Sequence, residues 1–316
     1  MPQRAATERL RSDPEVTLLD DVIAGASGEA SVASLLRQVK VLASRTGADP
    51  LAAWIDHELN GYPEDAELPL YRGPHVAHVL GHFLGGFGKE LLNVPIPSDS
   101  WDKTLEADHL FEIRLRESVA ELESMAAGKE ITLAWNANVI AAYNQFVHKG
   151  LIHRVVTGDL MLGEAKMPLS RHLLVGVLDA VRNRILDVAL QLEKVVPNAG
   201  QASAPDAEQG LAAMVINNHF YASSNVAIGG TDVKQTIKPP AKGDLEGLVS
   251  FLQQEGMTPD LLTELREAAN ADEADPGDGP GRWARVRAWF AKVATDAGTE
   301  AVGGAVATAA IGFLGG

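Results

Sequence analysis

The stretch SRHLLVGVLDAVRNRILDVALQLEKVV, residues 170–196, decides the fold class of this 316-residue chain. Its apolar side chains recur at intervals of three and four, so they would share one face of a helix. These residues are Leu173, Leu174, Val177, Leu178, Val181, Ile185, Ala189 and Leu192. Pro197 ends the pattern, because proline lacks the backbone donor that a continuing helix needs. So long an amphipathic helix predicts a mainly helical protein.

Shorter helical patterns precede this stretch. The sequence predicts helices over 17–27, 31–47 and 49–61. Asp49 is a natural N-cap for the third helix, and Pro50 stands at its first position, where the missing N–H costs nothing. These features predict a helical N-terminal region.

Two further helices and two segments of strand are expected before residue 170. Helical spacing returns over 105–127 and 131–152, whereas 70–97 and 155–167 contain glycines, prolines and short apolar runs that favour strands. The predicted fold is therefore mainly α, of the α+β class. Its first domain would span 1–196 and carry a small strand insertion.

The rest of the chain reads as a series of short segments. The composition of 197–212 predicts a linker, and 213–240 predicts a short β segment that could serve in assembly. A helical hairpin is expected over 241–271, followed by an acidic spacer rich in Gly and Pro over 272–281. The last segment, 282–316, predicts a basic-aromatic helix and then an apolar helix of small residues.

Composition excludes several classes of function. The formal net charge of −15 argues against non-specific binding to nucleic acid, which needs a basic surface. The chain has no cysteine, which excludes disulfides, iron–sulfur clusters and thiolate zinc sites. The first residues, MPQRAATERLRSDPEV, contain no apolar core of a secretory signal. We therefore expect a cytoplasmic protein that associates with the inner membrane only when active.

The end of the chain, GGAVATAAIGFLGG over 303–316, is apolar and has no charge after Glu300. Small residues fall four apart at Gly304, Thr308, Gly312 and Gly316, a spacing that lets helix backbones approach closely. The sixteen residues from Ala301 to Gly316 are slightly short of a membrane-spanning helix, which needs about twenty.

A basic and aromatic segment precedes this tail, and its characteristic residues are Trp283, Arg285, Arg287, Trp289 and Phe290. Aromatic and cationic residues followed by an apolar helix suit an element that acts on a membrane. The same pattern would also suit packing between copies of the chain, or burial of the tail against the protein itself. Disorder of the tail is the remaining alternative.

Four blocks of the sequence resemble the AbiTii domain family, in the same order. The first is LASRTGADPLAAWIDHELNGY at 42–62, and the others are NVPIP at 93–97, LRESVAELE at 115–123 and VLDAVRNRILDVALQLE at 177–193. The first block carries the family box Trp54, Glu58, Asn60, Gly61 and Tyr62. The resemblance implies a bacterial phage-defence protein of the abortive-infection type. It supplies no catalytic triad and no metal motif.

Two groups of residues could carry chemistry. His75, His78 and His82 would share one face of a helix, but on a strand His75 and His78 point to opposite faces, so surface histidines are the competing interpretation. Asp159, Glu164 and Lys166 could hold Mg²⁺ for phosphodiester cleavage, or could belong to a solvated hairpin. We expect no metal and no other cofactor.

Three hypotheses follow. The first is a non-enzymatic defence effector that self-assembles into a homo-oligomer and whose C-terminal helix acts on the inner membrane. The second is a nuclease that uses Asp159, Glu164 and Lys166. The third is a scaffold that binds a phage component or a partner toxin and uses the tail only for assembly.

Overall fold

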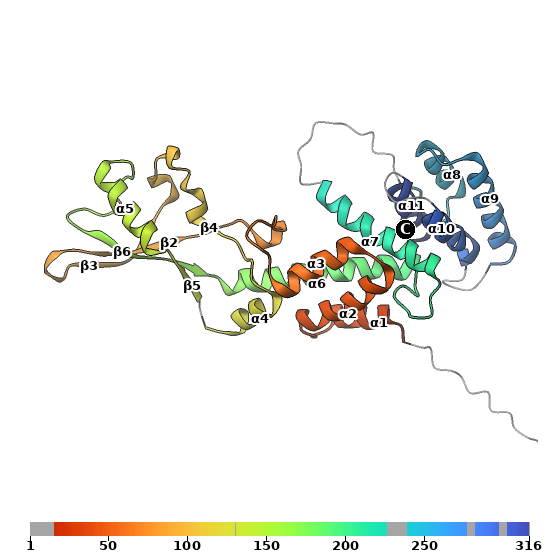
Figure 1. The fold of residues 1–316 in the computed structure, drawn as a ribbon, viewed down its shortest axis with the longest axis horizontal. Helices are drawn as coiled ribbons and strands as arrows, with labels where there is room; N and C mark the ends of the chain where they lie inside the picture. The colour runs from red at the N-terminus through yellow and green to blue at the C-terminus, as the bar shows by residue number, and fades with distance from the viewer. Residues whose placement is uncertain (1–15, 130, 226–238, 277–281, 297–301, 316) are drawn as a thin grey trace, which may run out of the picture. The chain divides into compact units, whose positions relative to one another are not determined.

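The computed structural model describes residues 16–129, 131–225, 239–276, 282–296 and 302–315 (Figure 1). Its contacts divide the chain into two compact units. The first, called here the helical unit, comprises Met1–Ile55 and Asn183–Gly316, and the second, called the sheet unit, is Asp56–Arg182. The structure is mainly helical with small antiparallel sheets, so the predicted fold class is confirmed.

The helical unit begins with the helices that the sequence predicts. They are α1 (Leu18–Ser27), α2 (Val32–Thr46) and the first half of α3 (Asp49–Asn60). Thr17 and Asp20 form a capping box at the start of α1, which satisfies two backbone donors of the first turn. Gly47 ends α2 with a φ of 70°, a left-handed conformation that glycine adopts without a steric penalty.

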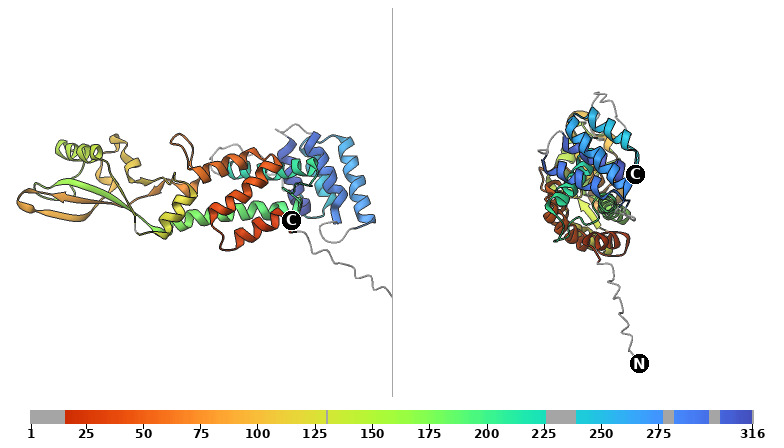
Figure 2. Two further views of the ribbon diagram at one scale, coloured as in Figure 1. Left: turned by 60° about the horizontal axis from the view of Figure 1, so that its bottom comes forward. Right: turned by 90° about the vertical axis from the view of Figure 1, so that its right-hand side faces the viewer.

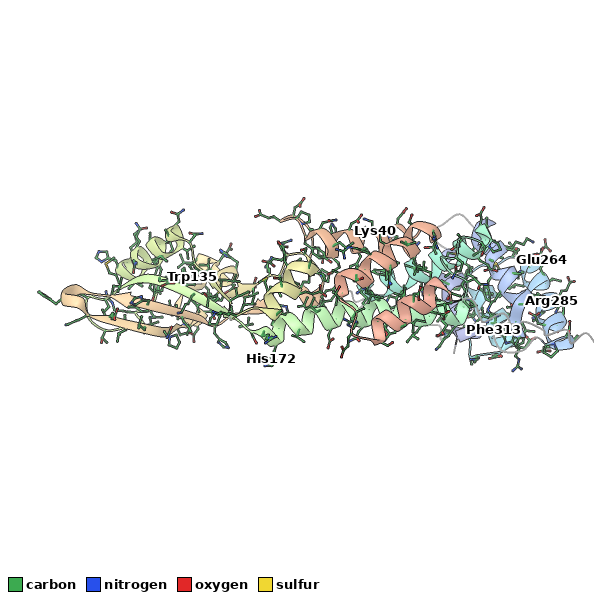
Figure 3. The ribbon with its side chains drawn as sticks, turned by 90° about the horizontal axis from the view of Figure 1, so that it is seen from below. Lys40, Trp135, His172, Glu264, Arg285 and Phe313 are labelled. Carbon is green, nitrogen blue, oxygen red and sulfur yellow. The ribbon has the colours of Figure 1, made fainter. Side chains whose placement is uncertain are left out.

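The second part of the helical unit contains the end of α6 (Arg171–Val195) and five later helices. These are α7 (Asp206–Asn225), α8 (Leu245–Gln254), α9 (Pro259–Ala274), α10 (Ala284–Asp296) and α11 (Val302–Ala310). Figure 2 shows α8, α9 and α10 side by side, and Figure 3 labels Glu264, Arg285 and Phe313 among these C-terminal helices. The helical hairpin predicted over 241–271 corresponds to α8 and α9, but α9 continues to Ala274, so the spacer predicted from residue 272 begins later than expected.

Helix α7 differs from the sequence-based expectation. The linker predicted over 197–212 is helical from Asp206, and the strands predicted over 213–240 are helical as far as Asn225. Residues 226–238 of that segment lie outside the described residues. Leu211, Ala212, Val215 and Ile216 are buried at helical spacing, and this burial outweighs the weak helix preference of the Asn and Ser residues that follow.

The sheet unit is built on four antiparallel strands in the order β3-β2-β6-β5. These strands are β2 (Val79–Leu84), β3 (Glu90–Ile96), β5 (Ile131–Ala134) and β6 (Met161–Leu169). A short second ladder joins β1 (His75–Val76) to β4 (Glu112–Ile113). The strand predictions over 70–97 and 155–167 are thus correct in kind.

The sheet unit also contains the helices α4 (Val119–Ala127) and α5 (Ala137–Lys149). The Asn144 side chain fixes α5 to β6, because it accepts a hydrogen bond from the Leu162 N–H at 2.9 Å and donates one to the Leu162 carbonyl at 2.8 Å. The helices predicted over 105–127 and 131–152 are shorter than expected, since 107–111 forms a 3₁₀ turn and 131–134 forms β5.

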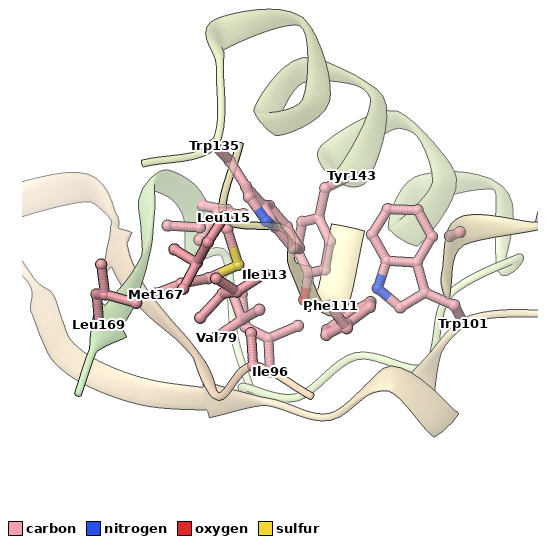
Figure 4. Close-up of a cluster of buried hydrophobic side chains, with 14 of the residues drawn as sticks. Val79, Ile96, Trp101, Phe111, Ile113, Leu115, Trp135, Tyr143, Met167 and Leu169 are labelled. Atoms are coloured by element: carbon pink, nitrogen blue, oxygen red, sulfur yellow. The ribbon is translucent and has the colours of Figure 1, made fainter. Parts of the chain in front are cut away.

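Aromatic side chains fill the core of the sheet unit. Trp101, Phe111, Trp135 and Tyr143 gather between α5 and the strands (Figure 4). The rings of Trp101 and Trp135 lie 6.0 Å apart and those of Phe111 and Trp135 lie 5.7 Å apart, both in edge-to-face geometry. Such pairs stabilise a core beyond the area that they bury.

Candidate functional site

The apolar tail of the chain is packed inside the helical unit. Helix α11 contacts α7, α8 and α10, and it continues into a π-helical turn, Ile311–Gly315. Val306, Ala307, Ala309, Ala310 and Phe313 are fully buried. The Phe313 ring lies 4.9 Å from that of Trp283, and the Phe313 carbonyl accepts a hydrogen bond from the Gly243 N–H at 3.0 Å.

The small residues of the tail have different surroundings. A Cβ on Gly312 would lie 2.5 Å from the Pro240 carbonyl oxygen, so only glycine fits there. The Thr308 hydroxyl lies 3.4 Å from the Asn218 side-chain oxygen on α7. Gly304 is exposed, and a Cβ there would meet nothing within 4 Å. Close packing therefore needs glycine at Gly312 but not at Gly304, and Gly316 lies outside the described residues.

The aromatic residues of α10 and of the turn before it are also buried. Trp283 is 8% exposed, Trp289 is 5% exposed and Phe290 is fully buried. The sequence places these residues on a segment that could face a membrane. In this structure they form part of the core of the helical unit instead.

The cations of α10 bind groups of the same unit. The Lys292 ammonium lies 2.7 Å from a Glu264 carboxylate oxygen, and the Arg285 guanidinium lies 3.2 Å from Asp272. Arg287 donates to the Val195 carbonyl at 3.1 Å and so binds the last turn of α6. Burial lowers the pKa of Arg287, while the nearby carboxylates of Asp272 and Glu208 oppose that change.

Two residues of the family box, Glu58 and Tyr62, take part in a cluster around a buried ion pair. Glu58 and Arg72 are both fully buried, and their closest side-chain atoms lie 2.5 Å apart. The hydroxyls of Tyr62 and Tyr71 also donate to Glu58, at 2.7 and 2.8 Å. Arg72 in turn donates to the carbonyls of Leu115 and Glu117. Burial, followed by the Glu58 charge, raises the pKa of Tyr62 far above its ordinary value.

The other box residues have structural surroundings. Gly61 has a φ of 90°, and a Cβ there would lie 2.9 Å from the Arg116 carbonyl oxygen. Asn60 is exposed at the end of α3. Trp54 lies in the helical unit, where its ring is 5.5 Å from that of Phe220. Sequence reasoning missed Arg72, because a single arginine in a glycine-rich segment gives no sign of its partner.

The structure does not gather the candidate nuclease residues at one cavity. Asp159 lines a hollow of about 770 Å³ beside α5, together with His148 and Arg154. Glu164 and Lys166 do not line this hollow. They alternate along β6 with the buried residues Ala165 and Met167, so they lie on the face opposite the core.

The three histidines are separated in the same way. A ring nitrogen of His82 lies 3.3 Å from the Glu90 carboxylate, and one of His75 lies 3.2 Å from the Tyr71 carbonyl oxygen. His78 is exposed. Within the described ranges, no three His, Cys, Asp or Glu side chains are grouped so that they could hold a metal ion. Likewise, no helix among those ranges has the length and apolarity required to cross a bilayer.

Comparison with known proteins assigns the class of this molecule. A family model for AbiTii matches residues 17–217, which is well over half of the chain. The chain therefore belongs to the AbiTii family, as the four sequence blocks predicted. Neither the curated proteins nor the solved structures contain a match. Family membership supports the role in abortive infection and phage defence that the resemblance implied.

Proposed function

We propose that this protein is a non-enzymatic abortive-infection effector whose C-terminal segment, 282–316, is stored inside the helical unit and released on infection. The observation that carries the proposal is the burial of the tail. A segment with uncharged, closely spaced small residues is held by its own chain through Phe313, Gly312 and Thr308. Release would expose this apolar surface together with the aromatic side chains of Trp283, Trp289 and Phe290.

The released segment would act in association with other copies at the inner membrane. The nine residues of α11 and the five of the π-helical turn reach ~21 Å at the rise of a helix. This is short of the ~30 Å of a bilayer's hydrocarbon core. We therefore propose that α10, with its cations and aromatic residues, lies in the interface while the small residues of the tail pack between copies.

A pair of glycine substitutions in the full-length protein tests the storage of the tail. Gly312→Val should displace the tail, because a Cβ there meets the Pro240 carbonyl. We expect toxicity to the host without infection, a loss of membrane potential, and leakage of dye from vesicles with the purified protein. Gly304→Ala is the matched control, because its site is open, and it should behave as the wild type. Equal behaviour of the two variants would contradict the proposal.

A disulfide that fixes the tail to α7 tests the storage of the tail by preventing its release. The chain has no cysteine, so Asn218→Cys combined with Thr308→Cys places one unique thiol pair across α7 and α11. Cross-linking of the Gly312→Val protein that carries this pair should suppress leakage, and reduction should restore it. Leakage that is unaffected by the lock would show that the tail is not the acting element.

The competing hypotheses predict other outcomes. A nuclease would lose toxicity with Glu164→Ala and would keep it when the tail is locked. A scaffold for a phage component or toxin would show no toxicity by itself and would form a stable complex with that partner. The three outcomes are separable in one set of growth and leakage assays.

A further inference from the structure

The β2–β3 hairpin of the sheet unit carries a cluster of exposed apolar side chains at its tip. Figures 1 and 2 both show this hairpin extending beyond α5. The cluster, called here the hairpin tip, comprises Leu84, Phe87, Leu91, Leu92 and Met161, which are 46%, 108%, 44%, 60% and 61% exposed. Met161 of β6 pairs with Leu84, whereas Leu91 pairs with Phe83 and so lies on the opposite face of the sheet. The hairpin tip therefore exposes apolar side chains on both of its faces. Exposed apolar side chains that gather in this way mark interaction sites.

Phe87 combines a fully exposed side chain with an unfavourable backbone conformation. Its φ is 58°, a left-handed conformation that costs a non-glycine residue free energy. A Cβ on either neighbour, Gly86 or Gly88, would meet nothing within 4 Å, whereas one on Gly85 would meet Leu160, so the turn is open around Phe87 and not at its base. A strained turn that presents one unsupported aromatic ring is a poor solution for stability alone. It indicates that this ring contacts another body.

Cationic groups lie beside the hairpin tip. Met161 also lines the 770 Å³ hollow, whose lining includes one cation, Arg154, and one carboxylate, Asp159. The Arg154 side chain is exposed and donates to the Gly158 carbonyl at 2.7 Å. Lys89 is exposed in the turn itself, and the adjacent Glu90 carboxylate lies 3.3 Å from His82. Arg154 and Lys89 therefore adjoin the apolar side chains, and the carboxylates of Asp159 and Glu90 lie beside these two cations.

Two observations argue against strand pairing with a second copy at this edge. Leu92 and Asn93 form a bulge in β3, since Gly81 pairs with Val94 and Phe83 pairs with Leu91. Asn93 has a φ of 54°, and Pro95 follows it without a backbone donor. Bulges and prolines are common devices that prevent an edge strand from pairing with another chain.

We propose that the hairpin tip binds the interface of a phospholipid bilayer. Phe87 and the neighbouring leucines would enter the boundary between headgroups and acyl chains, while Arg154 and Lys89 contact headgroup phosphates. The tip is convex, which suits a deformable lipid surface.

The hydrogen bonds of the turn limit how deeply the tip enters. Only two backbone hydrogen bonds close the turn, from the Gly85 N–H to the Lys89 carbonyl and from the Lys89 N–H to the Gly86 carbonyl, so its other amides need water. Water is present among headgroups but not in the hydrocarbon core, so contact is shallow. This surface is independent of the tail and goes beyond the function proposed above.

Flotation of the full-length protein with vesicles tests this inference. With vesicles of phosphatidylethanolamine and phosphatidylglycerol, Phe87→Ser should lower the bound-to-free ratio by about tenfold, which corresponds to the loss of one inserted aromatic ring. Val76→Ser is the matched control, because Val76 is 87% exposed near the opposite end of β2 and should have no effect. Arg154→Gln should weaken binding, and the loss should be larger when the vesicles contain the anionic lipid.

Two further arms separate the alternatives. Excess inorganic phosphate should leave flotation unchanged, because the apolar contact needs a bilayer; complete displacement would overturn the proposal in favour of a phosphate site. Protein with the Asn218→Cys and Thr308→Cys lock closed should still float, since its tail is held in place. Loss of flotation on locking would assign binding to the tail, and equal flotation of Phe87→Ser and wild type would also refute the inference.

Discussion

A fully buried carboxylate must be matched by donors on both oxygens, and Glu58 meets this condition with Arg72, Tyr62 and Tyr71. Two of these four residues, Glu58 and Tyr62, lie within the family box. These four residues, and not the whole box, therefore form a structural centre in the sheet unit. The polar side chains in it bind one another and are not presented to solvent.

Replacement of Arg72 by methionine should therefore be severe. It would leave the Glu58 carboxylate buried without its cation, which costs about 3–5 kcal/mol in the free energy of unfolding. Urea titration followed by circular dichroism measures this loss. Arg114→Met is the control, because Arg114 forms a half-exposed pair with Glu112 that contributes only about 0–1 kcal/mol. Similar losses in both variants would contradict the structural role of the Glu58–Arg72 pair.

His219 in α7 gives a pH dependence of known sign. Burial lowers the pKa of its imidazole below the ordinary 6.5, Arg184 lowers it further, and Asp187 opposes them. As the pH falls below the ordinary pKa of 6.5, the folded protein binds fewer protons than the unfolded chain. The free energy of unfolding is therefore highest above that pKa and decreases as the pH falls below it. The free energy of unfolding of wild type, minus that of His219→Gln, should be constant above about pH 7.5 and should decrease below about pH 6.5. A difference that stays constant down to about pH 5 would refute the assignment.

At the scale of elements, the first turn of α10 is held by a residue of another helix. Asp272 of α9 is 2% exposed and accepts hydrogen bonds from the N–H groups of Arg285 at 2.9 Å and Val286 at 3.0 Å. These are donors that a helix cannot satisfy internally. The carboxylate thus acts as an N-cap supplied from outside the helix, and it joins α9 to α10.

Asp272→Ala should cost about 1–3 kcal/mol, because it leaves the buried Val286 amide and the partly buried Arg285 amide without an acceptor. Hydrogen exchange at the Arg285 and Val286 amides should accelerate, and urea titration should show the loss of stability. Asp275→Ala provides the comparison, since that carboxylate is 86% exposed and lies 3.7 Å from the Arg285 guanidinium. Unchanged exchange at both amides in Asp272→Ala would be incompatible with this cap.

Elements with strong local signals could be predicted from the sequence. Helix α6 follows its apolar spacing, α2 ends at Gly47, and α3 begins at Asp49. Helix α7 could not be predicted in this way, because its helical state depends on burial of residues such as Val215 and Ile216 against distant segments. Tertiary contacts of this kind override weak local preferences and leave no trace in the spacing.

The candidate sites were predictable only in part. The spacing of small residues predicts close packing of the tail, but it does not identify the partner, and the structure supplies Trp283, Pro240 and Gly243 from the same chain. The exposure of Phe87 has no sequence signal beyond its glycine neighbours. Contacts between residues far apart in the chain decide both features, and no local pattern encodes them.

At the scale of the whole molecule, the division into two units predicts where displacement of the tail is felt. In Gly312→Val, hydrogen exchange should increase in α7, α8, α10 and α11, because their buried side chains lose contacts with the tail. Exchange within 56–182 should remain that of the wild type. Mass spectrometry of peptic fragments measures both regions in one experiment, and a uniform increase over the chain would indicate global unfolding instead.

The storage of the tail also has an evolutionary consequence. If release is toxic, a substitution that loosens the tail harms its carrier before any phage arrives, so selection removes it in uninfected populations. Positions where no side chain fits, such as Gly312, would then be conserved because a substitution there harms the host, and not because the defence requires that residue. Gly304, whose surroundings are open, would be free to drift. Lineages that lose the defence should accumulate substitutions at Gly312 first, because release of the tail is no longer toxic to them.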